Sequence, residues 1–245
     1  MTVFHINYEP DRGKVLSEID GIIKSGKPGY VCVADGNILT MVHNDPEYRK
    51  VVQGSMFSIV DSNWVPLFVR WIYGWKWEQY CGSQIFDDVT KMKRYRMLFL
   101  GSNQKVLDAL RNKMGEIDAA ILDMKFVELP FCNVEDFDYE GIASKINADR
   151  PDIVWVALGA PKQEQFASRL VKHLRRGVVI PVGAVFNFRS GLGIRRAPQW
   201  MVKCHIEFIY RIFSEPKKQI ARCWRIIINF PSIYFEEKRK SKNKI

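Results

Sequence analysis

The stretch VALGAPKQEQF, residues 156–166, passes from an apolar strand pattern directly into the start of a helix. A strand that ends at Leu158 and Gly159, with Pro161 at the helix start, exposes backbone N–H groups without partners inside the helix. These groups and the helix dipole favour a phosphate or carbonyl oxygen. The polar side chains that follow are Lys162, Gln163 and Glu164. We therefore predict a strand–turn–helix unit whose turn binds an anionic or hydroxyl-rich ligand.

The same alternation of strand and helix patterns recurs along the chain. Short apolar runs occupy residues 29–36, 56–62, 96–102, 125–131, 152–160 and 177–188. Helical spacing occurs at residues 103–116, 136–149 and 161–175. This rhythm predicts an α/β fold, a Rossmann-like and mostly parallel sheet with helices on both faces. Ligands bind at the carboxyl ends of the strands in such sheets, which is where several runs end in glycine, serine or aspartate.

The positive charge is concentrated at the C-terminal end. The formal net charge is +10, yet residues 1–193 hold 24 basic and 23 acidic residues, and residues 194–245 hold 13 basic and 4 acidic ones. Such asymmetry indicates a polyanionic partner: an acidic membrane surface, a nucleic acid or a phosphate-rich substrate. A solubilising tail is the plainer alternative.

A change of pattern near residue 195 divides the chain. We predict an α/β domain over residues 1–194, which contains the ligand-binding turn, and a basic helical appendage over residues 195–245. Ile206, Ile209, Ile212 and Phe213 share one face of a first helix. Pro216 is expected in the first turn of a second helix. Residues 236–245 are expected to form a charged, mobile end.

Several classes of protein are disfavoured. The chain contains no apolar run near the roughly 20 residues that span a bilayer, so we expect it to lie on a membrane without crossing it. The five cysteines are scattered and the histidines do not cluster with them, which disfavours zinc and indicates a reduced, cytoplasmic setting without a secretory signal. The acidic pair Asp136 and Asp138 is typical of a solvated helix start, so we expect no metal and no cofactor.

Three motifs in a fixed order carry a resemblance to a known family. They are LGAPKQE from residue 158, PVGAVFNFRSGLGIRRAP from residue 181 and HIEFIYRIFSEPKK from residue 205. Earlier blocks agree, among them NDPEYRKVV, FSIVDSNWVPLFVRWIYG and GSQIF. Across residues 30–225 the chain resembles the WecG/TagA/CpsF family, glycosyltransferase family 26.

The resemblance implies an inverting, metal-independent transferase. Such an enzyme moves N-acetylmannosamine, its uronic acid or a related sugar from a UDP-sugar to a polyprenyl-diphosphate-linked acceptor sugar, for cell-surface polysaccharide or teichoic acid. It also implies a C-terminal appendage that binds the membrane and closes the active site. The expected partners are the UDP-sugar, the lipid-linked acceptor and the anionic inner face of the cell membrane, with no nucleic acid. A homo-oligomer is compatible with the sequence, which leaves the oligomeric state, the sugars and the linkage open.

Asp61 is the predicted catalytic residue. It follows an apolar strand pattern at the place where the family carries its proposed base. Inversion at an anomeric carbon requires a carboxylate that accepts the proton of the attacking hydroxyl group. The alternative is that Asp61 caps a helix that starts near Trp64.

The resemblance and the strand-end pattern predict further substrate-binding residues. Sugar contacts are expected from Asp35 or Asn37, either of which can occupy the family's asparagine position. Arginines engage phosphates bidentately and are expected to stabilise the UDP leaving group, with membrane contact as the alternative for Arg211 and Arg222. The complete predicted set is Asp35, Asn37, Ser62, Gly82, Ser83, Gln84, Gly101, Gly159, Pro161, Lys162, Gln163, Glu164, Gly183, Arg195, Arg196, Arg211 and Arg222. Gln79, Gln84 and Asn187 depart from the family pattern, which leaves the donor sugar open.

Two other functions compete with this interpretation. A nucleic-acid-binding α/β protein would use the basic end, in which Trp200, Tyr210 and Trp224 alternate with cations. The chain carries no recognised nucleic-acid-binding motif to support it. A dinucleotide oxidoreductase would share the sheet, but no G-x-G-x-x-G follows the first strand and GLG at residues 191–193 comes late.

Overall fold

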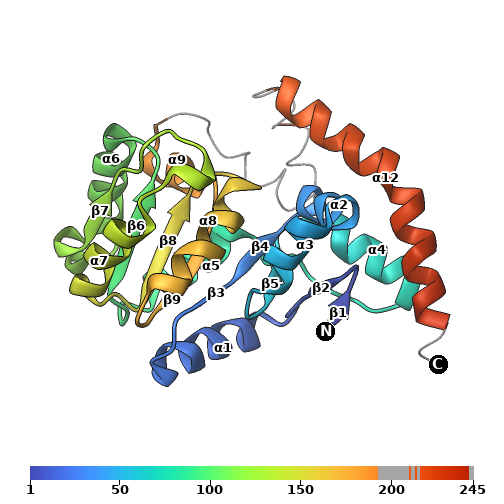
Figure 1. Ribbon diagram of the computed structural model, residues 1–245, viewed down its shortest axis with the longest axis horizontal. Coiled ribbons are helices and arrows are strands. Elements are labelled where there is room, and N and C mark those ends of the chain that lie inside the picture. The colour runs from blue at the N-terminus through green and yellow to red at the C-terminus, as the bar shows by residue number, and fades with distance from the viewer. Residues whose placement is uncertain (193–209, 211–212, 214–215, 243–245) are drawn as a thin grey trace.

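The computed structural model describes residues 1–192, 210, 213 and 216–242. Its centre is a parallel sheet in the order β3-β9-β8-β6-β7 (Figure 1). These strands are β3 (Gly29–Tyr30), β9 (Val178–Pro181), β8 (Ile153–Ala157), β6 (Met97–Gly101) and β7 (Lys125–Val127). A second parallel pair, β4 (Cys32–Ala34) with β5 (Ser58–Val60), continues the layer because β4 follows β3 after one residue. The predicted mostly parallel α/β fold is confirmed.

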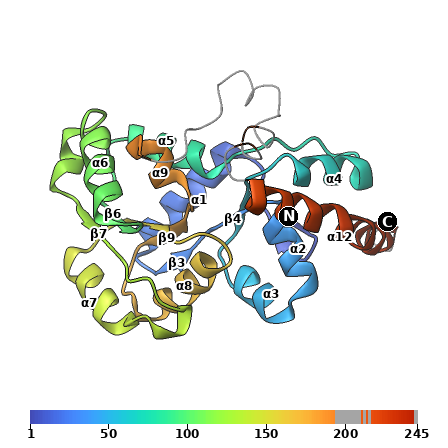
Figure 2. The same ribbon diagram turned by 90° about the horizontal axis from the view of Figure 1, so that it is seen from above.

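Helices cover both faces of the sheet. The first face carries α1 (Arg12–Ser25), α5 (Gly82–Lys91), α6 (Gln104–Gly115) and α9 (Val185–Ser190). The second carries α2 (Gly36–Asn44), α3 (Pro46–Gln53), α4 (Trp64–Tyr73), α7 (Tyr139–Asp149) and α8 (Lys162–Leu170). Figure 2 shows α5, α6 and α9 on the opposite side of the strands from α7 and α8. The remaining elements of residues 1–192 are the hairpin β1 (Thr2–Val3) and β2 (Ile6–Asn7) and three 3-10 turns, at Ala119–Asp123, Val134–Asp136 and Val171–His173.

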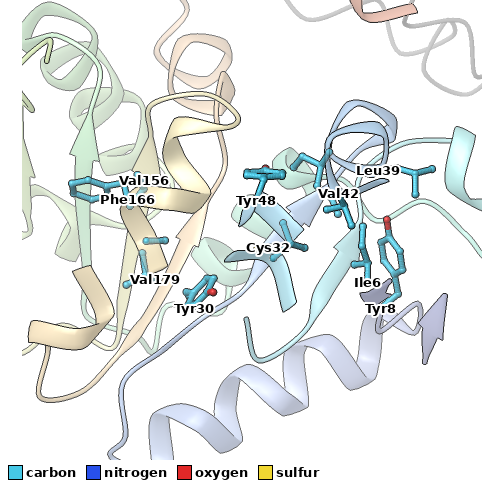
Figure 3. Close-up of a cluster of buried hydrophobic side chains, with 14 of the residues drawn as sticks. Ile6, Tyr8, Tyr30, Cys32, Leu39, Val42, Tyr48, Val156, Phe166 and Val179 are labelled. Carbon is cyan, nitrogen blue, oxygen red and sulfur yellow. The ribbon is translucent and has the colours of Figure 1, made fainter. Parts of the chain in front are cut away.

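Alternation along the strands produces two hydrophobic cores. In β8, Ile153 and Trp155 join the core under α5 and α6, whereas Val154 and Val156 join the opposite one. Successive side chains of a strand point to opposite faces, so a strand buried on both sides reads as one continuous apolar run. Figure 3 shows part of the second core, where Val156 and Phe166 lie in the same cluster as Cys32 and Tyr48.

Two sequence predictions require adjustment. Predicted helices 103–116 and 136–149 correspond to α6 and α7, but the helix predicted to reach residue 175 ends as α8 at Leu170 and continues as a 3-10 turn. The apolar run at 177–188 forms β9 only in its first half, and Val185–Ser190 is helix α9. Apolar residues of a buried helix and of a buried strand cannot be told apart by periodicity in so short a run.

The long C-terminal helix α12 (Pro216–Lys242) begins at Pro216, as predicted, and runs alongside α2 and α4 (Figure 1). Ile226 and Ile233 are buried in the second core. The helix also includes residues 236–242, for which we predicted a mobile end. Glu236 and Glu237 explain the difference, because Glu236 binds His5 and Glu237 accepts from Tyr73 of α4. The predicted domain boundary at 194/195 and the first predicted helix of the appendage, apart from Tyr210 and Phe213, lie outside the described residues.

Candidate functional site

A cavity of about 440 Å³ opens where the strands of the parallel layer end. Small-molecule sites commonly have volumes of this order, roughly 300–1,000 Å³. One side, the strand-tip wall, consists of residues that follow β4, β5, β8 and β9, together with the start of α5. The other side, the α12 wall, consists of Gln219, Arg222, Cys223 and Ile226. The cavity therefore lies where parallel α/β folds bind their ligands.

Among the helices that begin at the strand-tip wall are α2, α5 and α8. Gly36 starts α2, Gly82 starts α5, and the Gly159–Ala160 turn leads into α8, and all of these line the cavity. Helix N-termini carry exposed N–H groups and a partial positive charge. The convergence of three such ends favours an anionic group in the cavity.

Asp61 follows β5 and lines the cavity. Its Oδ1 accepts a hydrogen bond of 2.7 Å from the backbone N–H of Gly82, at the start of α5. Gln79 donates to its backbone carbonyl at 2.6 Å. The alternative prediction, that Asp61 caps α4, is wrong, because Asn63 occupies the N-cap position of that helix. Asp61 thus presents a carboxylate whose orientation is set by a neighbouring helix.

Asp35 and Asn37 stand beside Asp61 in the strand-tip wall. Asp35 caps α2 by accepting from the N–H of Ile38 at 2.8 Å. Ser62 accepts from the N–H of Gly36 at 3.1 Å and so joins the ends of β4 and β5. The side chain of Asn37 is nearly buried and accepts from Arg225 of α12 at 2.9 Å. Asn37 therefore connects the two walls of the cavity.

The turn after β8 contributes Gly159 and Gln163 to the cavity. Gln163 Oε1 accepts from the N–H of Gly159 at 3.1 Å, while its Nε2 donates to Glu164 at 2.8 Å. Gly183, from the turn after β9, has φ of 58°, a region that favours glycine. A Cβ there would lie 3.5 Å from Gln163 Oε1, so the two turns pack closely.

Most of the predicted residues within the described part of the chain meet at this cavity. Those that line it are Asp35, Asn37, Asp61, Ser62, Gly82, Ser83, Gly159, Gln163, Gly183 and Arg222. Arg195, Arg196 and Arg211 lie outside the described residues.

Five predicted residues are not brought to the cavity lining. Gln84 Oε1 accepts from the N–H of Cys81 and closes the first turn of α5. Lys162 donates to the carbonyl of Cys132 and faces the ring of Phe137, away from the cavity. Glu164 is fully buried. Pro161 lines a separate cavity of about 360 Å³ between α2, α8 and α12.

Position 101 requires a glycine for a structural reason. Its φ is 104°, and a Cβ would lie 2.6 Å from the carbonyl oxygen of Ala157 on the neighbouring strand. Such a contact is far shorter than any that a side chain tolerates, so Gly101 allows β6 and β8 to end side by side.

Sequence reasoning missed other parts of the lining. Trp64 and Leu67 of α4, and Gln219, Cys223 and Ile226 of α12, contribute apolar and polar surface. A helical projection of α12 could have placed Gln219, Arg222, Cys223 and Ile226 together, because they recur at spacings of three and four. Only the docking of α12 on α2 and α4 shows that this face meets the cavity.

Acidic residues elsewhere have structural roles. Asp138 caps α7 by accepting from the N–H of Gly141 at 2.9 Å, and Asp136 accepts from Asn133 at 3.0 Å. Both belong to a solvated helix start, as the sequence indicated. Within residues 1–192 and the described part of α12, no group of three or more histidine, cysteine or acidic side chains gathers in a way that could hold a metal ion.

Comparison with known proteins gives one family. The sequence profile of the glycosyl transferase WecG/TagA/CpsF family matches residues 1–244. The chain is similar to N-acetylglucosaminyldiphosphoundecaprenol N-acetyl-beta-D-mannosaminyltransferases of two Bacillus species. It is 26% identical to that of Bacillus subtilis over 82% of this chain and 75% of the relative. The identity to that of Bacillus spizizenii is 24%, over 85% of this chain and 78% of the relative. A Staphylococcus aureus protein of the same name is 23% identical over 77% of this chain and 73% of the relative.

Proposed function

The chain belongs to the WecG/TagA/CpsF family of glycosyl transferases, and on this basis we propose that it transfers N-acetylmannosamine or a related sugar from a UDP-sugar. The proposed acceptor is a sugar linked to polyprenyl diphosphate, because the Bacillus relatives carry such an acceptor in their names. The single observation that carries the proposal is the meeting of Asp61 and Arg222 at one cavity beyond the strand ends.

Asp61 is the proposed general base. Its Oδ1 accepts from the N–H of Gly82, and the residue lines the cavity. As the acceptor hydroxyl group attacks the anomeric carbon, its proton moves to Asp61 and the bond to the UDP oxygen breaks on the opposite face of the sugar. This sequence of bond changes inverts the configuration at that carbon.

The departing UDP is proposed to leave among positive charges. The starts of α2, α5 and α8 present partial positive charge at the cavity. Arg222 adds a guanidinium group from α12, which can bind phosphate oxygens bidentately. Arg195, Arg196 and Arg211 remain proposed contributors on the sequence evidence alone. Asp35, Asn37, Ser83 and Gln163 are proposed to bind the sugar and nucleotide hydroxyl groups.

The outer face of α12 is proposed to rest on an anionic membrane surface. Five apolar side chains recur at helical spacing there and each is more than half exposed: Ile220, Trp224, Ile227, Ile228 and Phe235. Basic residues follow them at Lys238 and Arg239. This combination is typical of helices that lie in the plane of a membrane interface. Within the described residues no helix is both long enough and apolar enough to cross a bilayer.

Transfer with purified protein tests the proposal directly. UDP-N-acetylmannosamine and other UDP-sugars are incubated with a short-chain polyprenyl-diphosphate-N-acetylglucosamine in the presence of EDTA. We expect transfer of one sugar with inversion and release of UDP. No transfer from any UDP-sugar, with or without added divalent metal, would contradict the proposal. Transfer that appears only with added metal would contradict the role given to the arginines.

Two binding measurements test the proposed partner of the basic end. We expect flotation with vesicles that contain anionic lipid and no binding to duplex DNA at the same physiological salt. Duplex binding without flotation would favour the nucleic-acid alternative.

A further inference from the structure

Glu164 is a buried carboxyl group for which the proposed chemistry has no direct use. It lies in the first turn of α8 and is fully buried. Its Oε1 accepts from Gln163 at 2.8 Å, and its Oε2 accepts from the hydroxyl group of Tyr48 at 3.1 Å. Both of these donors are neutral. A buried carboxylate whose donors are neutral amide and hydroxyl groups is costly, which calls for a reason for its presence.

Gln163 supplies that reason, because its carboxamide is fixed at both ends. Oε1 accepts from the N–H of Gly159, and Nε2 donates to Glu164. A rotated carboxamide would set Nε2 against the N–H of Gly159 and Oε1 against an oxygen of Glu164. A donor would then face a donor at Gly159, and an acceptor would face an acceptor at Glu164. Gln163 also lines the cavity, with its carboxamide beside Gly183, and its Nε2 has one further N–H.

We propose that Glu164 is a positioning residue, which holds the Gln163 carboxamide so that its second N–H donates to an oxygen of the nucleotide-sugar. This inference rests on the proposed sugar transfer. The Glu164 carboxylate does the positioning by accepting, so it works best in its ionised form. Glu164 itself does not contact the substrate.

The surroundings of Glu164 place its ionisation near neutrality. The titratable groups that face it from the described elements are Tyr48 of α3, Cys32 of β4 and Asp35 before α2. Burial raises the pKa of Glu164 to about 7, against the hydrogen bonds from Gln163 and Tyr48, which lower it. Tyr48 and Cys32 belong to the buried cluster in Figure 3, and burial raises the pKa of each, so both stay neutral here.

Protonation of Glu164 would weaken the arrangement. A proton on Oε1 would oppose the N–H of Gln163. A proton on Oε2 would require the Tyr48 hydroxyl group to turn, and it would leave Oε1 as a neutral and weaker acceptor. Transfer should therefore decline as the pH falls through about 7, because the carboxamide loses its fixed orientation.

The test compares kcat and KM for the UDP-sugar against pH in three proteins: the full-length wild type, Glu164→Gln and Tyr48→Phe. In the wild type we expect kcat/KM to fall on an acid limb near pH 7. Glu164→Gln keeps the shape and an acceptor oxygen but cannot ionise, so this limb should disappear. Tyr48→Phe removes a hydrogen bond to the carboxylate, which should raise the pKa and move the limb upward by about half a unit to one unit.

Two results would overturn the inference. One is an acid limb that stays in place in both variants, since it would then belong to another group such as Asp61. The other is a pair of variants that lose only thermal stability while their pH profiles match the wild type, because Glu164 would then be merely structural. Thermal unfolding of all three proteins checks that each is folded.

An infrared measurement separates this inference from the proposed function. The C=O stretching band of a protonated carboxyl group should appear as the pH falls through about 7 and be missing in Glu164→Gln. Absence of that band in the wild type would overturn the inference even if transfer occurs. Absence of transfer by the wild type, with the band present, would count against the proposed function instead.

Discussion

The two walls of the cavity are built in different ways. The strand-tip wall follows directly from the parallel layer, in which β8 pairs on both sides with β6 and β9 and its core residues are fully buried. The α12 wall is held by Ile226, Ile233 and a set of polar side-chain pairs. The difference teaches that the proposed base stands at the end of a strand of the layer, β5, which is paired with β4. The cation proposed to stabilise the leaving group, Arg222, comes instead from α12, a helix that packs against α2 and α4.

The same contrast exists between the two faces of α12. The inner face buries two isoleucines, each of which contributes about 1.5–3 kcal/mol when fully removed from water. The outer face leaves a row of large apolar side chains exposed. A soluble monomer rarely exposes such a row without a partner. The inner face therefore has its partner within the chain, whereas the outer face calls for one outside it.

The strongest test of the strand-tip wall is Asp61→Asn. The asparagine still accepts from the N–H of Gly82, so the fold should be unchanged. Loss of the base should lower kcat by about 10³-fold. Steady-state transfer kinetics measure the effect. The matched control is Asp138→Asn, which alters a helix cap away from the cavity and should leave kcat within twofold, roughly, of the wild type. A folded Asp61→Asn protein with near-normal kcat would remove Asp61 from the mechanism.

A matching test of the α12 wall is Arg222→Gln. Loss of the guanidinium group should lower kcat by about 10²-fold, because negative charge on the departing UDP then lacks one partner. Arg169→Gln is the control, since Arg169 is part-exposed and pairs with Glu135 at 2.8 Å. Kinetics at several concentrations of UDP-sugar separate kcat from KM. An equal loss in both variants would show that overall charge matters rather than the place of Arg222.

The outer face of α12 is tested by the double substitution Ile227→Ser and Phe235→Ser. Removal of two exposed apolar side chains should weaken partition onto anionic vesicles about tenfold or more. Cosedimentation with vesicles of increasing anionic lipid content measures the partition. Phe131→Ser removes a fully exposed aromatic ring elsewhere and should leave partition unchanged. Equal loss in the control would mean that α12 is not the surface involved.

The smallest expected effect concerns the docking of α12. Burial by itself would raise the pKa of Glu236, but hydrogen bonds from Lys240 and His5 outweigh it and lower the pKa to about 2. A carboxyl group with a depressed folded pKa stabilises the protein above its unfolded pKa, and this stability is lost as the pH falls toward the folded value. Glu236→Gln should therefore lower the melting temperature by about 1–3 °C at neutral pH.

Thermal unfolding at several pH values measures this effect. The difference between Glu236→Gln and the wild type should shrink as the pH falls from about 4.5 toward 2. Glu47→Gln is the control, because Glu47 pairs with Lys50 on the exposed surface. A difference that is constant over the whole pH range would show that the charge of Glu236 does not hold α12.

Local patterns were enough to predict most of the layer and much of the site. The strand ends at Asp35, Asp61 and Gly159 were found because parallel strands place their carboxyl ends at one edge. It was harder to predict which of the residues after Gly159 line the cavity and which are buried. Gln163 and Glu164 are neighbours with similar side chains, yet one lines the cavity and the other is fully buried. Their difference arises from a 100° rotation along α8 and from Tyr48 of another helix.

By itself the sequence determined the α/β class, the strand-end location of the candidate site and the basic character of the C-terminal end. These properties depend on short-range periodicity and on residue type, which a linear chain carries explicitly. Only the tertiary structure decided that Gly101 serves strand packing, that Glu164 faces inward and that α12 lies on α2 and α4. Those outcomes depend on contacts between residues far apart in the chain, such as Arg225 with Asn37, and no local pattern encodes such a contact.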